Sequence, residues 1–150
     1  METASSSKLI CTTMPSSPYS LGLVSEFVSR FPPFNNFEFG KMVQSLLYQL
    51  EAGTHVAAGL DDRIVGYVGW IKTTRLIAEA WLNHNGELHA TFDDPDAIAV
   101  TVLVTEKSRY ILPLIKHAKT MNSNYSVYWK RHLRDGQTSA MRGVRKKALT

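Results

Sequence analysis

The chain has 150 residues, of which 44% are hydrophobic, and this length and composition fit one domain with a core of ordinary size. Its longest uncharged apolar run is about half as long as a membrane-spanning helix requires, and its first residues lack the pattern of a signal peptide. A single cysteine, Cys11, excludes an internal disulfide and a cysteine-based zinc cluster. We therefore expect a soluble, cytoplasmic protein without a transmembrane segment.

The positive charge is concentrated near the C-terminal end. The formal net charge of the chain is +4, but residues 130–150 hold seven basic residues and one acidic residue, a net charge of +6. The remaining residues therefore carry −2. Such an end can contact nucleic acid, an anionic membrane surface or an acidic protein, and a solvated tail with no single partner is the alternative. We expect residues 136–150 to form a basic C-terminal tail.

The N-terminal part predicts a tail followed by two helices. Residues 1–19 are rich in serine, threonine and proline, and we expect them to be disordered. From Ser20, an expected N-cap, apolar residues recur at helical spacing until the pair Pro32-Pro33 ends the helix. A second amphipathic helix is predicted from about Phe37, with Gly53 as the residue that follows it.

A β-hairpin and a short helix are predicted next. Residues 55–60 and 64–71 are rich in β-forming residues and are separated only by a short polar turn. Gly66 and Gly69, inside the second strand, indicate a bulge, the close approach of a ligand or another chain, or a tight fit beneath a neighbouring helix. Helical spacing then returns over residues 74–82.

The apolar run from Ala97 to Thr105 predicts a central strand that is buried on both faces. A helix is expected from Ser108 to Met121, and residues 125–131 are extended again. Strand, helix and strand in this order form a crossover unit, which needs a second layer over the sheet. The expected fold class is therefore α/β in the mixed α+β sense: one domain over residues 20–135, a mixed sheet with helices on both faces.

The sequence contains no standard catalytic or cofactor motif, neither a glycine-rich phosphate loop nor a metal-ligand spacing, so we expect no metal. Asp93, Asp94 and Asp96 form an acidic cluster, for which acid–base work or cation binding competes with a solvated turn before a strand. The aromatic and basic run over residues 125–132 suits base stacking and phosphate binding, but it also has the alternation of a half-buried strand.

Between Leu21 and Trp70 a series of small motifs occurs in a fixed order, which are Leu21-Gly22, Pro32-Pro33, Gly53 after a helix, Asp61 in the hairpin and the run Val65 to Trp70. With these motifs in this order, the segment resembles the bacterial lysine acyltransferases that activate RTX toxins. The resemblance continues loosely through residues 78–81 and the central strand and helix. The resemblance implies a GNAT-like acyltransferase fold, and transfer of a fatty acyl group from acyl carrier protein to a lysine of a partner protein.

The family uses a histidine just after the proline turn and an aspartate in the central strand. The first position corresponds here to Phe34, which has no acid–base chemistry. The second corresponds to Asp93 or to Thr101, depending on the end from which the strand is aligned. We therefore predict Asp93 as the catalytic acid, with Asp96 behind it. The transfer needs a deprotonated lysine amine and a donor for the developing oxyanion.

The expected donor is a carrier-protein thioester and not acyl-CoA, because Thr105-Glu106-Lys107-Ser108 stands where a glycine-rich pyrophosphate loop would follow the central strand. An acidic carrier protein suits a basic docking surface, whose predicted residues are Arg131, Arg134, Arg142, Arg145, Lys146 and Lys147. Two alternatives stay open. One is a relative that has kept the fold and lost catalysis, and the other is a non-catalytic module whose basic end contacts nucleic acid or an acidic protein.

Overall fold

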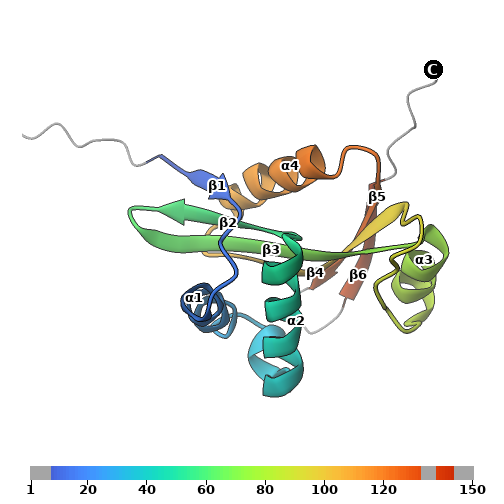
Figure 1. Ribbon diagram of the computed structural model, residues 1–150, viewed down its shortest axis with the longest axis horizontal. Helices are drawn as coiled ribbons and strands as arrows, with labels where there is room; N and C mark the ends of the chain where they lie inside the picture. Colours follow the sequence, from blue (N-terminus) through green and yellow to red (C-terminus); the bar gives the residue numbers. More distant parts are fainter. Residues whose placement is uncertain (1–7, 133–137, 144–150) are drawn as a thin grey trace, which may run out of the picture.

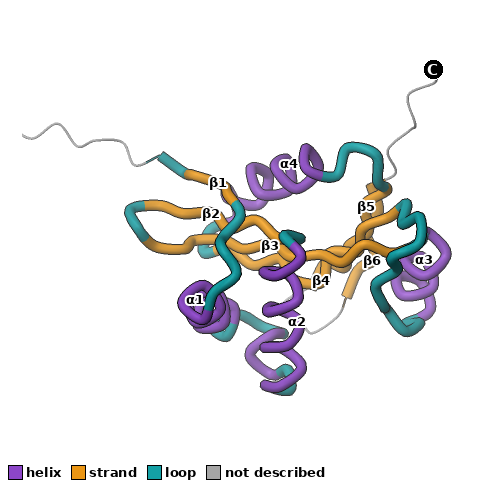
Figure 2. The backbone as a smooth tube through the Cα atoms, in the orientation of Figure 1, coloured by secondary structure: helices purple, strands orange, loops and turns teal. Residues whose placement is uncertain are grey.

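The computed structural model describes residues 8–132 and 138–143 of the chain, and side chains as far as Lys130. The strands of this part form one six-stranded mixed sheet in the order β1-β2-β3-β4-β5-β6. Helices α1 and α2 lie on one side of the sheet and α4 lies on the other (Figures 1 and 2). The predicted mixed α/β class, with helices on both faces, is confirmed.

The first strand corrects the expected disordered tail over residues 1–19 for its second part, whereas residues 1–7 lie outside the described residues. Strand β1 (Ile10–Thr12) pairs antiparallel with β2 (His55–Leu60), with Cys11 opposite Ala58. Composition misses this segment because edge-strand pairing depends on backbone hydrogen bonds, which polar residues make as well as apolar ones. The sheet therefore begins before the predicted domain boundary at Ser20.

Helix α1 (Pro18–Val28) begins earlier than predicted, since its N-cap is Ser17 and not Ser20. The Ser17 Oγ accepts a hydrogen bond from the Ser20 N–H at 3.0 Å, and Pro18 occupies the first turn, where its missing N–H costs nothing. After the short helix η1 (Phe34–Asn36) the chain enters α2.

Helix α2 (Phe39–Ala52) is followed by Gly53, as predicted, and this glycine has a left-handed φ of 71°. The hairpin follows as predicted, with β3 (Arg63–Thr73) antiparallel to β2. Asp61 and Asp62 at its tip both have positive φ, the backbone pattern of a two-residue type I′ turn. Helix α3 (Arg75–His84) is capped by the Thr74 hydroxyl.

Strand β4 (Ala97–Thr105) is central, as predicted, because it lies between β3, which is antiparallel to it, and β5 (Ser126–His132), which is parallel. The crossover between them is formed by η2 (Ser108–Tyr110) and α4 (Ile111–Met121).

Strand β6 (Thr138–Gly143) was not predicted, since it falls in the expected basic tail over residues 136–150. It pairs antiparallel with β5. The sequence TSAMRG lacks a clear apolar alternation, and its pairing to a neighbouring strand is what makes it extended.

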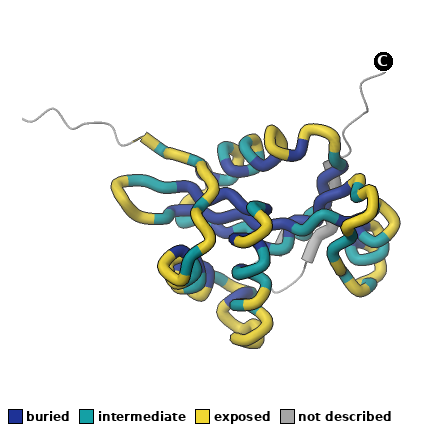
Figure 3. The backbone as a smooth tube through the Cα atoms, viewed as in Figure 1, coloured by how far each residue is buried: buried dark blue, intermediate teal, exposed yellow. Residues whose placement is uncertain are grey.

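The core has one main layer on each face of the sheet. Trp70 and Leu114 belong to the layer under α4, and Phe27 and Leu46 belong to the layer under α1 and α2. Figure 3 shows the middle of the sheet buried and the outer faces of the helices exposed. Within the described residues, no helix is long and apolar enough to cross a bilayer.

Candidate functional site

The candidate site begins where β4 and β5 stop pairing. Their parallel register runs from Ala97 opposite Ser126 to Val100 opposite Trp129 and ends there. Strand β4 nevertheless continues to Thr105, and β5 continues as the partner of β6. The two strands therefore diverge beyond Val100, and the sheet opens along the second half of β4.

A β-bulge lies at the same point on the other side of β4. Val102 pairs with Gly69 and Val100 pairs with Trp70, so one step along β3 matches two steps along β4. Thr101 is the extra residue and has no register partner in either neighbouring strand. The bulge also reverses the alternation of β4: Val100 packs on the α4 side, whereas Val102 packs on the α1 and α2 side.

A pocket of about 610 Å³ occupies this opening, a volume in the ordinary range of ligand sites. Its lining comes from the η1 region, α3 and the loop after it, β4, the start of α4, and β5. The lining residues are Pro32, Phe34, Phe37, Trp81, Leu88, Val100, Thr101, Leu103, Ile111, Trp129 and Lys130. Among these described residues the only polar side-chain groups are the Thr101 hydroxyl, the Lys130 amine and the indole N–H groups of Trp81 and Trp129. The pocket is therefore suited to an apolar chain with one polar end.

A buried hydrogen-bond network fixes the Thr101 hydroxyl from behind. Gln49 on α2 is fully buried and donates from Nε2 to Thr101 Oγ1 at 2.8 Å, while its Oε1 accepts from the Tyr67 hydroxyl at 2.7 Å. Gly69 makes this possible, because a Cβ there would overlap the Gln49 carboxamide. Of the alternatives for Gly69, the bulge and the tight fit beneath a helix are both confirmed. The Thr101 hydroxyl donates in turn to the Gly69 carbonyl, at the long distance of 3.4 Å.

The network continues to His55, which is also fully buried. The Met14 N–H donates to His55 Nε2 at 2.8 Å, so Nε2 is an acceptor, and Nδ1 donates to the Gln49 carbonyl at 3.0 Å. These partners assign the neutral tautomer with the proton on Nδ1. Burial lowers the pKa of His55, which keeps the ring neutral, and its ring stacks on Tyr67. His55 thus holds the network in place and does not face the pocket lining.

Lys130 is the one titratable side chain among the described lining residues, which include no tyrosine. Its Nζ lies 4.5 Å from the centre of the Trp81 ring and donates to Asn85 Oδ1 at 3.3 Å. Burial lowers the pKa of Lys130. Within the part of the chain that the structure describes, it has no carboxylate partner.

The structure brings together two of the positions that the resemblance matched and leaves the third apart. Phe34 and Thr101 both line the pocket, whereas Asp93 is exposed in the loop between α3 and β4 and is not among the lining residues. Asp96 is exposed as well, and its Oδ1 accepts from the Arg75 N–H at 2.9 Å at the start of α3. Catalytic roles for Asp93 and Asp96 therefore stay predictions.

The predicted docking residues lie mostly beyond the described chain. Arg131 belongs to β5 and Arg142 to β6, where it pairs with Tyr128. The remaining predicted residues lie outside the described residues, and they are Arg134, Arg145, Lys146 and Lys147. The aromatic run over residues 125–132 has the two faces of a half-buried strand, as predicted, because Val127 and Trp129 pack toward α4 and Tyr128 packs toward α3.

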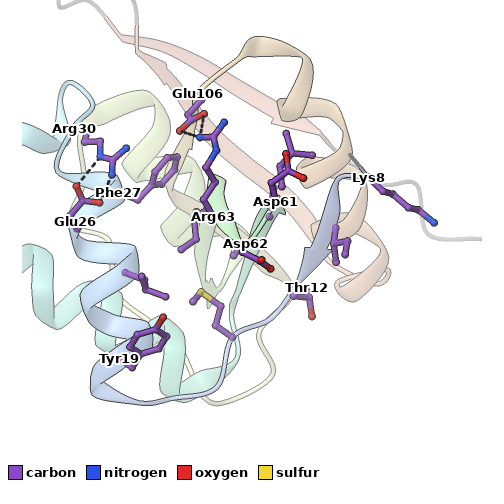
Figure 4. A pocket seen from close by; sticks show the side chains of 18 residues that line it. Lys8, Thr12, Tyr19, Glu26, Phe27, Arg30, Asp61, Asp62, Arg63 and Glu106 are labelled. Atoms are coloured by element: carbon purple, nitrogen blue, oxygen red, sulfur yellow. Dashed lines mark hydrogen bonds and ion pairs between the residues drawn. The ribbon is translucent and has the colours of Figure 1, made fainter. Parts of the chain in front are cut away.

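A second pocket, of about 670 Å³, lies between α1 and the β2–β3 hairpin (Figure 4). Seven of its 18 lining residues are charged, and four of them are already paired: Arg30 with Glu26 and Arg63 with Glu106, each at 2.6 Å. The described residues form no group of three or more side chains suited to holding a metal ion. We therefore take the pocket at the β4–β5 opening as the candidate site.

Comparisons with known proteins agree with this fold. The scan against family models and the search of curated proteins found no match. Among solved structures, a GNAT-family acetyltransferase from Streptococcus agalactiae is similar, with a TM-score of 0.58 and 9% identity over 93% of this chain and 96% of that one. Mosquito arylalkylamine N-acetyltransferase-like 5b has a TM-score of 0.60 and 10% identity over 86% and 79%.

The GphF GNAT-like decarboxylase, solved in complex with isobutyryl-CoA, has a TM-score of 0.62 and 12% identity over 85% of this chain and 67% of that one. At such identities the likeness concerns the fold alone. The chain therefore has a GNAT-like fold, as the resemblance implied, and the toxin-activating family stays a prediction.

Sequence reasoning missed the roles of Gln49 and Lys130. Gln49 lies one turn after Leu46 on the apolar face of α2, and an amide in that position, with a glycine-containing strand beneath the helix, is the signal that could have found it. Lys130 follows Tyr128 on the same strand face, which makes a half-buried amine predictable, but no local pattern indicates Trp81 as its neighbour.

Proposed function

We propose that this protein is an acyltransferase that binds the acyl chain of a thioester in the pocket between β4 and β5 and transfers it to a lysine of a partner protein. The observation that carries the proposal is the pocket itself, apolar and aromatic along its walls, with a positioned hydroxyl at the point where the strands part. An apolar wall with few oriented polar groups suits a fatty chain that ends in a reactive carbonyl.

The Thr101 hydroxyl is the proposed donor to the thioester carbonyl. Its oxygen accepts from Gln49, and in this proposal its proton leaves the long 3.4 Å hydrogen bond to the Gly69 carbonyl for the thioester carbonyl oxygen in the pocket. Attack by the lysine amine forms a C–N bond, places negative charge on that oxygen and then expels the thiolate. A hydroxyl held by a buried network needs little reorganisation to stabilise this charge.

The incoming lysine must lose its proton before it attacks. Neither a carboxylate nor an imidazole is among the described lining residues. Asp93 therefore acts, in this proposal, from the exposed loop before β4 and only on an amine that approaches from outside, with Asp96 as the second candidate.

The proposed donor is acyl carrier protein. The segment between β4 and α4 contains no glycine, and its Glu106 carboxylate is paired with Arg63 at the end of the strand, an arrangement that does not favour a pyrophosphate. We propose that the basic end docks the carrier protein. Charge reversal at Arg145, Lys146 and Lys147 should then weaken carrier binding at low salt about tenfold or more, whereas equal affinity would remove the docking proposal.

The first test is transfer of an isotope-labelled acyl group from acyl carrier protein, with acyl-CoA in parallel, to lysine-containing proteins, read by mass spectrometry. Label on a partner lysine that depends on Thr101 supports the proposal. A folded protein that binds the acylated carrier without any transfer would favour the inactive relative. Binding of neither donor would overturn the assignment of the pocket.

A further inference from the structure

We propose that Lys130 is itself an acylation site: a thioester bound in the β4–β5 pocket transfers its acyl group to the Lys130 amine, and the product blocks the pocket. The inference rests on the proposed function only in requiring that the pocket binds an acyl thioester. It adds a modification site and a means by which the protein limits its own activity.

Thr101 and Lys130 occupy corresponding positions on the two strands that border the pocket. Val100 and Trp129 are the last paired residues of β4 and β5, so Thr101 and Lys130 are the next residue on each strand, and both line the pocket. Their side chains are on one face of the sheet, because Thr101 bonds to Gln49 on α2 and Lys130 lies against Trp81 on α3, both opposite α4. A carbonyl held by the Thr101 hydroxyl therefore has the Lys130 amine on the facing strand.

The Lys130 amine has only weakly binding neighbours among the described residues. The described partners of the Lys130 ammonium are the Trp81 ring and one amide oxygen at 3.3 Å, and neither is a carboxylate. Both contacts are weak compared with an ion pair, so the amine is free to turn into the pocket. Desolvation lowers the pKa of Lys130, which increases the share of neutral, nucleophilic amine at neutral pH.

The chemistry balances without a further reactant. The neutral Nζ attacks the thioester carbonyl carbon, a C–N bond forms and the C–S bond breaks. The nitrogen gives up one proton, and the departing thiolate takes it up, so the products are a free thiol and an amide at Lys130. Because an amide does not transfer its acyl group onward under these conditions, the modified protein keeps the chain in its own pocket.

The modification would change the site in two ways. It removes the positive charge of Lys130 and with it the interaction with the Trp81 ring. It also fills the apolar volume that the next donor needs. Self-acylation is therefore self-limiting, and it accumulates when donor is abundant and acceptor lysine is scarce.

To test this, the full chain is incubated with myristoyl–acyl carrier protein and, separately, with myristoyl-CoA. Acylation of each lysine is then measured by mass spectrometry of chymotryptic peptides. Lys72 is the matched control, because it is a half-buried strand lysine whose Nζ lies 5.4 Å from the Tyr125 ring, outside the pocket lining. We expect Lys130 to be acylated at least about tenfold faster than Lys72, as proximity to a bound thioester requires. The Lys130→Arg variant should lose this product and Lys72→Arg should keep it.

A parallel titration of each donor by calorimetry separates this inference from the proposed function. Donor binding and transfer to a partner lysine without modification of Lys130 would overturn the inference alone. Modification of Lys130 without transfer to any partner would support it and count against the proposed reaction. If neither donor binds, or if Lys72 and Lys130 react equally, the inference is wrong. Equal labelling of both lysines by N-hydroxysuccinimide acetate is the control for simple accessibility.

Discussion

Thr101 and Lys130 are the first residues beyond the last paired positions of two parallel strands, and they line one pocket from opposite strands. This relationship follows from a bulge on one side of β4 and the end of pairing on the other. A buried polar network holds Thr101, whereas the partners of Lys130 within the described residues are a ring and an amide. The site therefore combines one fixed polar group with one adjustable group.

Thr101→Val should destabilise the protein, because it removes the acceptor of the Gln49 Nε2 bond and leaves a fully buried amide donor unpaired. We expect a loss of about 1–3 kcal/mol in the free energy of unfolding, measured by urea titration. Thr101→Ser, which keeps the hydroxyl, should lose less and should retain acyl transfer. Equal stability of the two variants would contradict the described network.

Gly69→Ala should be more damaging than an ordinary glycine substitution, because its Cβ would overlap the Gln49 carboxamide. We expect a loss of about 1–3 kcal/mol in unfolding free energy. Gly22→Ala is the control, since Gly22 is exposed in α1 with open space around it and its substitution should be neutral or stabilising. Adding Gln49→Ala to Gly69→Ala should recover part of the loss, and strict additivity would argue against the clash.

His55 should make the protein less stable at acidic pH. Burial lowers its folded-state pKa, so below about pH 6.5 the unfolded chain binds a proton that the folded chain does not. The free energy of unfolding should fall with decreasing pH by up to about 1.4 kcal/mol per pH unit from this group, with no contribution above that range. Urea titrations from pH 5 to 8 should show a smaller slope for His55→Gln, and identical slopes would exclude His55 as the cause.

Leu88→Trp should shorten the pocket, because Leu88 lies in its lining, on the loop between α3 and β4. We expect the affinity for a palmitoyl donor, measured by calorimetry, to fall about tenfold or more while that for an acetyl donor changes little. A parallel loss for both donors would mean that the acyl chain does not occupy this volume.

Asp93→Asn tests the acid predicted from the sequence. If Asp93 takes the proton of the acceptor lysine, single-turnover transfer should be lost in this variant. Asp94→Asn is the matched control, because asparagine tolerates the φ of 44° at that position. Unchanged transfer in Asp93→Asn, with a rate that rises with pH as free lysine deprotonates, would show that the amine enters the pocket already neutral.

The sequence predicted the elements that have strong periodicity. The run from Ala97 to Thr105, the hairpin around Asp61 and the helix closed by Gly53 are all present, since hydrophobic period and turn chemistry are local properties. Both outer strands were missed, because β1 and β6 are extended through pairing with a neighbour and not through their own composition. Register has the same non-local origin.

The site was less predictable than the fold. Gly69 was recognised as unusual, but its partner Gln49 is twenty residues away in the chain and on another element. Thr101 was one of two residues, with Asp93, that matched the family's aspartate position. A strand made of uncharged residues gives no sign of where a bulge lies. Lys130 was considered only as part of the basic end and of the aromatic and basic run over residues 125–132, because its neighbour Trp81 lies on α3, 49 positions earlier in the chain.

The one-residue bulge also affects how distant relatives of this chain can be recognised. Apolar side chains of β4 change phase at Thr101, so a relative whose strand lacks the bulge would align in phase on only one side of this position. A gap of a single residue placed at Thr101 restores the match on both sides, whereas an ungapped alignment assigns half of the strand to the wrong face. An alignment that permits this gap would match the inward-facing residues of both halves of β4 to those of the relative.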